Sequence, residues 1–452
     1  MRIHLIAIGG AVMHQLAISL HLSGHEVSGS DDEIFDPALS NLKKYNLIQD
    51  NFFWNPDNIT SEIDIIILGM HAKADNPELQ KARETGIKCV SFPEFIYEHS
   101  QTKKRVVIGG SHGKTTITSM IMHVLKETGK HFDYLVGSKI RGFDVMVSLS
   151  NDANLIIIEG DEYLSSTLDP RPKFHLYKPD IAVISGIEWD HINVFPTFEN
   201  YRKQFELFAE MVNPDGALIY TADDQNVYDV IQSCKNNVEK IAYSALPNKT
   251  DSGKSVVLYN NVPIEVNVFG EHNMKNMSAA LEVCRQLGVA DASFFASIAS
   301  FNGAAKRLET IYESDNGTVF RDFAHAPSKV KATVKAVKKR NPERDLIAVF
   351  ELHTFSSMNK DFLFQYKGSM DMADIPIVFF SPHAFELKRL EMFSSEFVRT
   401  AFTNKNTLVF NNIKDLENHL SCIIKPNTNI LLMSSGNFDG MKIECLFDKL
   451  EN

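Results

Sequence analysis

A glycine-rich segment carries the residues best suited to chemistry, at positions 109–116 with the sequence Gly-Gly-Ser-His-Gly-Lys-Thr-Thr. It stands between a β-branched run and a helical pattern. In such a turn, backbone N–H groups close around phosphate oxygens, and the positive end of the following helix adds to the attraction. Lys114 would reach the terminal phosphates, and the Thr115 hydroxyl would ligate Mg²⁺.

The spacing departs from the strict GxxxxGK[ST] pattern, because Ile108 stands at its first glycine position. The alternative interpretation is a turn that needs glycines only to change direction. The combination of a strand, a Gly-Lys pair and a hydroxyl favours a nucleotide-phosphate site. Its predicted members are Gly110, Ser111, His112, Gly113, Lys114, Thr115 and Thr116.

Two acidic clusters follow later strands of the same block. Glu159-Gly160-Asp161-Glu162 follows the predicted strand 155–158, and Glu188-Trp189-Asp190-His191 follows the predicted strand 181–184. Open parallel sheets place ligand chemistry at the carboxyl ends of their strands. Mg²⁺ prefers hard oxygen ligands, so a carboxylate from one strand end and a group from the other could share one ion. The alternative is a solvated acidic loop and a packed histidine.

Polar residues with a possible nucleotide role recur further along the chain. Asn273 and Asn276 share a helix face and could hydrogen-bond a base edge, although Asn273 could instead be an N-cap. Arg307 could clamp a phosphate at a domain boundary, and its alternative role is an exposed ion pair. A further motif, Asp-Phe-Ala-His-Ala-Pro, occupies residues 322–327.

Apolar strand-like runs alternate with helical patterns along the whole chain, which predicts an α/β fold of mostly parallel sheets with flanking helices. The elements group into three blocks, which we expect to be domains of residues 1–102, 103–305 and 306–452. The predicted strands are 3–8, 25–29, 63–68, 88–91, 105–108, 155–158, 181–184, 319–322, 346–350, 377–380 and 430–433. The predicted helices are 11–22, 114–127, 274–287 and 329–339.

Composition excludes several classes of protein. The 452 residues carry 46 Lys and Arg against 57 Asp and Glu, a net charge of −11, so no basic field is available for nucleic acid. The five cysteines form no CxxC pair, which argues against a zinc ribbon or a disulfide framework. No apolar stretch approaches the roughly 18 residues of a membrane span, and the N-terminus lacks a signal sequence. We expect a cytoplasmic protein, a monomer or weak dimer, that binds neither nucleic acid nor a membrane.

The order of these motifs resembles that of the Mur ligase family, ATP-dependent enzymes that build the peptide stem of bacterial cell-wall precursors. GGSHGKTT, EGDE, EWDH, GEHNMKN, KRLE and DFAHAP occur in the family's order over the whole chain. The resemblance implies three domains that bind, in chain order, a UDP-sugar, ATP with Mg²⁺, and the incoming amine. The first and third would be Rossmann-like, and the second would contain the phosphate loop.

The resemblance also implies roles for individual residues near the phosphates. Lys114 and Thr115 would hold the ATP phosphates and Mg²⁺, and Glu159 and His191 would be metal ligands.

It implies a second group at the rest of the nucleotide. Asn273 and Asn276 would lie at the adenine, and Asp322 at the ribose. Arg307 would contact phosphate near the hinge, and His325 would lie on the phosphate side of the closed site.

The N-terminal block is similar to the two family members that take UDP-N-acetylmuramate. Their glycine-rich first turn corresponds to residues 8–13, with Val12 in place of a later glycine, and their SGSD segment corresponds to residues 28–31. The residues expected to bind the UDP-sugar are Gly9, Gly10, Ala11, Ser30 and Asp31.

One of these two members adds L-alanine, and the other adds the tripeptide L-Ala-γ-D-Glu-meso-diaminopimelate. Residues 35–37, 168–174 and 433–440 look more like the second, so we expect the tripeptide, with L-alanine as the alternative. The peptide carboxylates need cationic or N–H donors. The candidates are Arg389, next to Lys388 in what could also be a polar helix start, and the turn Ser435, Gly436 and Asn437.

The resemblance implies transfer of the ATP γ-phosphate to the lactyl carboxylate, followed by attack of the amine on the acyl phosphate. Three other functions make different demands on the sequence. A nicotinamide oxidoreductase would require a full GxGxxG, a nucleotide-gated binding module would lack the strand-end Glu159 and His191, and a folylpolyglutamate or cyanophycin synthetase would lack the SGSD block.

Overall fold

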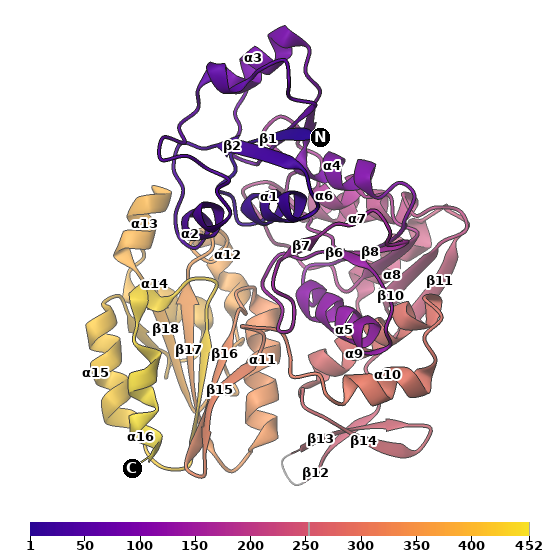
Figure 1. Cartoon of the computed structure of the whole chain (residues 1–452). Coiled ribbons are helices and arrows are strands. Elements are labelled where there is room, and N and C mark those ends of the chain that lie inside the picture. Colours follow the sequence, from indigo (N-terminus) through magenta and orange to yellow (C-terminus); the bar gives the residue numbers. More distant parts are fainter. Residues whose placement is uncertain (252–253, 452) are drawn as a thin grey trace. The chain divides into compact units, whose positions relative to one another are not determined.

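The computed structural model describes residues 1–251 and 254–451. Residues 252, 253 and 452, the last of which ends the third predicted domain, lie outside the described residues. The chain divides into two compact units, of which the first comprises residues 1–188, 199–244 and 279–294 and the second the remainder. Figure 1 labels the elements of both units. The predicted domain boundaries at 102/103 and 305/306 remain predictions.

A four-stranded parallel sheet opens the first unit, in the order β2-β1-β3-β4. Its strands are β1 (Arg2–Ile6), β2 (Glu26–Ser30), β3 (Ile65–Leu68) and β4 (Cys89–Ser91). Its helices are α1 (Met13–Leu22), α2 (Ala38–Lys44), η1 (Pro56–Asn58), α3 (Pro77–Thr85) and α4 (Phe92–His99). The central strands are continuous apolar runs because helices cover both faces of a parallel sheet.

The second sheet of this unit has seven strands in the order β11-β10-β9-β5-β8-β6-β7, all parallel except the β6–β7 pair. The strands are β5 (Lys104–Gly109), β6 (Asp133–Leu135), β7 (Val147–Ser148), β8 (Leu155–Glu159), β9 (Ile181–Ile184), β10 (Ala217–Thr221) and β11 (Glu239–Tyr243). The helices of this part are α5 (Lys114–Glu127), α6 (Lys173–Leu176), α7 (Phe198–Glu210) and α8 (Gln225–Ser233). Two later helices, α9 (Glu271–Gln286) and α10 (Asp291–Ile298), are each divided between the two units. β5 is central, with β8 on one side and β9 on the other, so ligand groups meet at its carboxyl end.

The second unit contains a small antiparallel sheet that the sequence patterns did not predict, in the order β12-β13-β14. Its strands are β12 (Asn248–Asp251), β13 (Lys254–Tyr259) and β14 (Val262–Val266).

A six-stranded sheet dominates the second unit, in the order β15-β16-β20-β17-β18-β19, with only the β15–β16 pair antiparallel. Its strands are β15 (Glu309–Ser314), β16 (Gly317–Asp322), β17 (Asp345–Leu352), β18 (Ile375–Phe380), β19 (Leu408–Phe410) and β20 (Thr428–Met433). Its helices are α11 (Pro327–Arg340), α12 (Lys360–Leu363), η2 (Phe364–Tyr366), α13 (Pro382–Lys388), α14 (Ser395–Phe402), α15 (Ile413–Ile423), η3 (Phe438–Gly440), η4 (Ile443–Leu446) and α16 (Asp448–Glu451).

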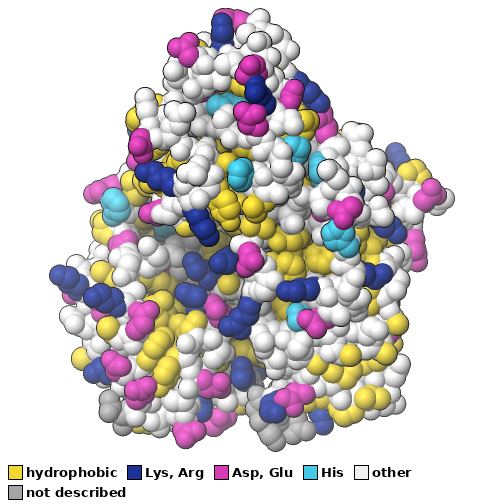
Figure 2. Space-filling view, in the orientation of Figure 1, with side chains coloured by type: hydrophobic (Ala, Val, Ile, Leu, Met, Phe, Trp, Pro, Cys, Tyr) yellow, Lys and Arg dark blue, Asp and Glu magenta, His cyan; other side chains and the backbone are white. Residues whose placement is uncertain are grey.

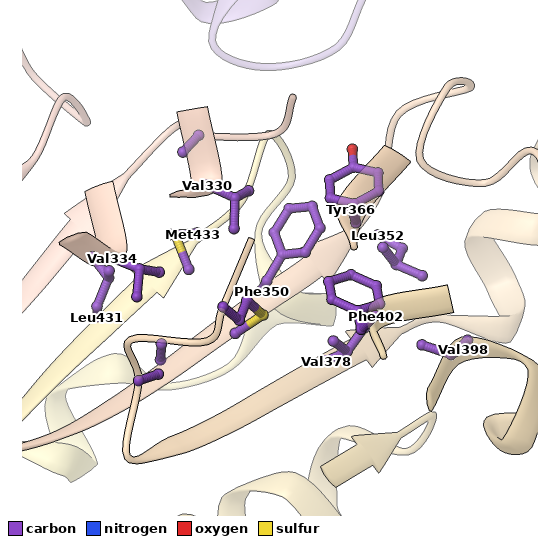
Figure 3. Close-up of a cluster of buried hydrophobic side chains, with 14 of the residues drawn as sticks. Val330, Val334, Phe350, Leu352, Tyr366, Val378, Val398, Phe402, Leu431 and Met433 are labelled. Carbon is purple, nitrogen blue, oxygen red and sulfur yellow. The ribbon is translucent and has the colours of Figure 1, made fainter. Parts of the chain in front are cut away.

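One face of this sheet holds the apolar cluster of Figure 3, in which α11 packs on the strands. Val330 and Val334 of α11 lie with Phe350 of β17 and Met433 of β20, all fully buried. Burial of side chains of this size contributes about 1.5–3 kcal/mol each. This packing fixes the strand ends that carry the polar residues of the second unit.

The predicted α/β class is confirmed, and each predicted strand and helix is present with ends shifted by at most a few residues. None of the helices in the described part of the chain combines the length and apolarity that a membrane span needs. Acidic and basic side chains are both spread over the face shown in Figure 2.

Candidate active site

The phosphate loop joins β5 to α5 at the carboxyl end of the central strand of the seven-stranded sheet. Gly110 has φ 132°, and a Cβ there would lie 2.2 Å from Ser185 Oγ, so no larger residue fits. Gly113, the N-cap of α5, has φ 82° and no side chain to cap the first turn. The first N–H groups of a helix lack intrahelical partners, so this end is suited to phosphate oxygens.

Lys114 is held at the start of α5 by two acceptors. Its Nζ donates to Gly110 O at 2.7 Å and lies 2.5 Å from Glu162 Oε2. Burial acts to lower the pKa of Lys114, but the carboxylates of Glu162 and Asp161 outweigh it, so the net pKa is raised. The lysine therefore stays charged in the absence of a nucleotide.

Two oxygen groups suited to bind Mg²⁺ lie next to each other near Lys114. The Thr115 hydroxyl donates to Glu159 Oε1 at 2.6 Å, and the Gly137 amide donates to Glu159 Oε2 at 2.9 Å. A hydroxyl and a carboxylate in contact next to a phosphate loop fit Mg²⁺, which takes a few protein oxygens together with phosphates and water. These two residues are the groups of the first unit that would hold the ion.

The glycine turn of the first sheet closes on Asp31. The Gly9 amide donates to Asp31 Oδ2 at 2.7 Å, and a Cβ on Gly9 would lie 2.9 Å from the same oxygen. Gly10 and Ala11 lie on the more exposed part of the turn. Ser30 is fully buried and its hydroxyl donates to Glu78, so its side chain is engaged inside the protein, and its role at the UDP-sugar remains a prediction. Buried Glu78 binds this hydroxyl and holds the loop from inside.

Asp31 gives this loop a testable pH dependence. Burial raises the pKa of Asp31 to about 6, against the smaller effect of its backbone hydrogen bonds. The folded state then binds the proton more tightly than the unfolded chain, so this carboxyl stabilises the fold at low pH. That contribution disappears as the pH rises from about 4 to about 6.

We expect the stability of the wild-type protein relative to Asp31→Asn to be about 1 kcal/mol greater at pH 5 than at pH 7.5. Urea unfolding of both proteins at the two pH values measures this difference. An unchanged difference would show that Asp31 titrates normally, and a difference of opposite sign would likewise contradict a raised pKa.

In the second unit, two predicted motifs come together at Asp190 and His325. His325 Nε2 lies 3.6 Å from Asp190 Oδ2, and His325 Nδ1 lies 2.9 Å from Phe323 O, which accepts its proton. Asp190 also accepts from the His191 amide at 2.7 Å and from Ser356 Oγ at 3.2 Å. Burial, then Lys329, lower the pKa of His325, so the ring is neutral at neutral pH.

Asn273 and Asn276 lie on one buried face of α9. Asn273 Nδ2 donates to Phe269 O at 2.9 Å, and Asn276 Nδ2 donates to Asn273 Oδ1 at 3.4 Å. The alternative of N-capping by Asn273 is wrong, because α9 begins at Glu271 and the Asn273 side chain donates where a cap must accept. The role of this pair at a base remains a prediction.

Arg307 and Asp322 both lie in the second unit. The Arg307 guanidinium stacks over the Phe323 ring at 4.4 Å from its centroid. Asp322 accepts from Thr333 Oγ1 at 2.9 Å and from the Ala324 amide at 3.1 Å. Burial raises the pKa of Asp322, and the charge of Arg307 opposes that shift. These contacts hold both side chains at the carboxyl end of β16.

The predicted amine-site turn follows β20 and surrounds a buried carboxylate. Glu351, at the end of β17, accepts from Ser434 Oγ and from the Phe438 amide, and its Oε1 lies 3.8 Å from His353 Nδ1. The Gly436 amide donates to Ser434 Oγ at 2.6 Å. We expected this turn to present free N–H groups, which is wrong for Gly436 because its amide already has an acceptor inside the turn.

Two polar atoms at this turn are buried without a hydrogen-bond partner among the described residues, Ser435 Oγ and His353 Nδ1. Burial lowers the pKa of His353, and the nearby charge of Lys388 lowers it further. Arg389 is exposed at the C-cap of α13, so the alternative of a polar helix start is wrong for Lys388 and Arg389. Asn437 precedes η3. Glu351 and His353 were missed because neither lies in a recognisable motif.

Glu159 and His191, the two predicted metal ligands, fall in different compact units, with the division between Glu188 and Trp189. Their sharing of one ion remains a prediction. His191 has φ 53°, a conformation that costs a non-glycine residue energy and that accompanies its backbone bond to Asp190.

Protein-family models match three successive parts of the chain. The Mur ligase family catalytic domain matches residues 2–104, the Mur ligase middle domain matches residues 108–284, and the Mur ligase glutamate ligase domain matches residues 306–436.

Individual proteins are similar over most of the chain. A UDP-N-acetylmuramate–L-alanine ligase of Sulfurihydrogenibium is 30% identical over 96% of this chain and 95% of its own. The Escherichia coli UDP-N-acetylmuramate–L-alanyl-γ-D-glutamyl-meso-2,6-diaminoheptandioate ligase is 31% identical over 78% and 79%. The crystal structure of a murein peptide ligase from Psychrobacter arcticus has a TM-score of 0.65 at 24% identity, over 100% of this chain and 99% of that one, which shows a shared fold.

Proposed function

Because the chain belongs to the Mur ligase family of ATP-dependent amide-bond ligases, we propose that it joins UDP-N-acetylmuramate to the tripeptide L-Ala-γ-D-Glu-meso-diaminopimelate. ATP would activate the lactyl carboxylate as an acyl phosphate, and the terminal amine of the peptide would displace phosphate to form the amide. The product would return a recycled peptide to peptidoglycan synthesis.

The main support for a tripeptide acceptor is the 31% identity to the Escherichia coli ligase, whose name specifies that tripeptide. The turn after β20 supports it, because Ser435 Oγ, His353 Nδ1 and nearby Lys388 offer polar and cationic groups to peptide carboxylates. The second candidate acceptor is free L-alanine, favoured by the 30% identity to the Sulfurihydrogenibium ligase over nearly its full length.

The chemistry follows from positioning and charge neutralisation. Lys114 and the first-turn amides of α5 would bind the ATP phosphates, and Thr115 and Glu159 would hold Mg²⁺, which neutralises phosphate charge when bound. Gly9, Gly10, Ala11 and Asp31 would bind the UDP-sugar.

The second unit contains further residues with proposed roles toward ATP. Arg307 would neutralise the charge of the transferred phosphate, and His325 would lie beside that phosphate. Asn273 and Asn276 would contact adenine, and Asp322 would contact ribose. Since the reaction brings two polyanions together, these groups lower its barrier mainly by orientation and electrostatics.

A substrate panel tests the proposal. Purified protein with ATP, Mg²⁺ and UDP-N-acetylmuramate is assayed for ADP formation with L-alanine, L-Ala-γ-D-Glu or the tripeptide. We expect kcat/KM for the tripeptide to exceed that for L-alanine at least about tenfold. Efficient use of L-alanine without tripeptide turnover would assign the protein to the L-alanine-adding activity.

Two cations of the proposed peptide site give a further prediction. We expect Lys388→Ala and Arg389→Asn to raise KM for the peptide about tenfold and to leave KM for ATP unchanged, because each would remove a cation of the proposed peptide site. Asparagine suits the left-handed backbone of Arg389, where φ is 55°. Arg399→Ala, which removes an exposed cation of α14, is the control and should change neither KM. Equal effects of all three variants would exclude a specific role.

A further inference from the structure

Tyr201 of α7 has a fully buried side chain whose hydroxyl reaches the phosphate loop. Tyr201 Oη lies 2.8 Å from Ser111 Oγ and donates to Glu162 Oε1 at 3.3 Å. The ring packs edge-on against Phe205, with centroids 5.3 Å apart. Packing alone would be served equally well by phenylalanine, so the hydroxyl calls for another explanation.

The donor in each of these hydrogen bonds can be assigned. A tyrosine has one O–H group, and since Tyr201 donates it to Glu162, the Ser111 hydroxyl must donate to Tyr201. Ser111 Oγ in turn accepts from the Glu188 amide at 2.9 Å. The series of hydrogen bonds thus runs from the Glu188 amide through Ser111 and Tyr201 to the Glu162 carboxylate.

Glu162 connects this hydrogen-bond network to Lys114. Its other oxygen, Oε2, lies 2.5 Å from Lys114 Nζ, and the side chain of Glu162 is 1% exposed. A buried carboxylate that loses its cation is strongly destabilised unless other donors remain. When Lys114 turns its charge to an incoming phosphate, a second donor on Glu162 offsets that loss.

We propose that Tyr201 is a positioning residue for nucleotide binding, which supports Glu162 and thereby allows Lys114 to move between this carboxylate and the phosphates of ATP. Aligned hydrogen bonds polarise one another in a low-dielectric interior, so the same hydrogen-bond series also holds Ser111 and the glycine-rich loop in place. The proposal rests on nucleotide binding at this loop and not on the identity of the acceptor.

Tyr201→Phe tests it, because this variant keeps the ring and removes only the hydroxyl. We expect the Kd for ADP, measured by titration calorimetry without acceptor or UDP-sugar, and the KM for ATP to rise about tenfold, which is the loss typical of a hydrogen bond to a charged group. KM for UDP-N-acetylmuramate should not change. Tyr243→Phe, which removes another buried hydroxyl at the far edge of the same sheet, is the matched control.

A second comparison separates positioning from stability. In a Glu162→Gln background, Tyr201→Phe should weaken ADP binding by less than twofold, because the neutral amide no longer requires a second donor. The proposal is overturned if Tyr201→Phe leaves ADP affinity unchanged. It is also overturned if Tyr201→Phe and Tyr243→Phe lower ADP affinity and melting temperature equally, or if the Tyr201 effect is the same with Glu162→Gln.

Discussion

Lys114→Ala is expected to lower the rate of ADP formation by about 1,000-fold or more. The residue is the cation of the phosphate loop, and removal of one preorganised charge from a transferring phosphoryl group costs that order of rate. The measurement is the steady-state rate of ADP release at saturating UDP-N-acetylmuramate and acceptor.

The stability of the Lys114→Ala variant must be measured separately, because the structure predicts a loss that the sequence does not. Alanine suits the first position of a helix, which from sequence alone predicts an intact fold. In the structure, however, Lys114→Ala leaves the buried Glu162 carboxylate without its cation, a change that costs about 3–5 kcal/mol in comparable buried pairs. We therefore expect the single variant to melt at a markedly lower temperature than the wild type.

The double variant Lys114→Ala/Glu162→Gln separates the two effects. Glutamine removes the unpaired charge and still accepts from Tyr201, so the melting temperature should recover while activity does not. If the double variant turned over ATP within tenfold of the wild-type rate, Lys114 would not be the phosphate-binding cation.

The parts of the fold that could be predicted are those whose strands are buried on both faces. β3, β8 and β9 are continuous runs of β-branched and apolar residues, as parallel strands covered by helices must be. The antiparallel sheet β12-β13-β14 was missed because β12 is entirely polar and β14 contains Pro263.

The candidate site divides along a similar line. Lys114 and Thr115 could be found because the glycine-rich loop and the start of its helix are local in sequence, so spacing alone reveals them. Tyr201 lies 90 residues from Ser111 and 39 from Glu162, on a helix with no motif, and only the folded chain brings them together. The pairing of Asp190 with His325 joins two motifs that the sequence shows separately.

Glu159→Ala is expected to lower kcat at least about 100-fold and to raise the Mg²⁺ concentration needed for half-maximal activity. The variant removes the carboxylate that contacts the Thr115 hydroxyl, and with it the hard-oxygen pair that would hold the ion. Asp169→Asn, in the segment between β8 and β9, is a matched control. The Asp169 carboxylate is bound by Arg171, so removing its charge should change the Mg²⁺ requirement less than twofold.

His191 makes the same experiment a test of whether the two units act together. His191→Gly removes the ring and suits the positive φ of 53° at this position. If Glu159 and His191 hold one ion, either variant alone abolishes the site, and the double variant should be hardly slower than the slower single variant. If the two effects on kcat instead multiply, the residues act at separate places, and His191 serves through its backbone bond to Asp190 and not as a metal ligand.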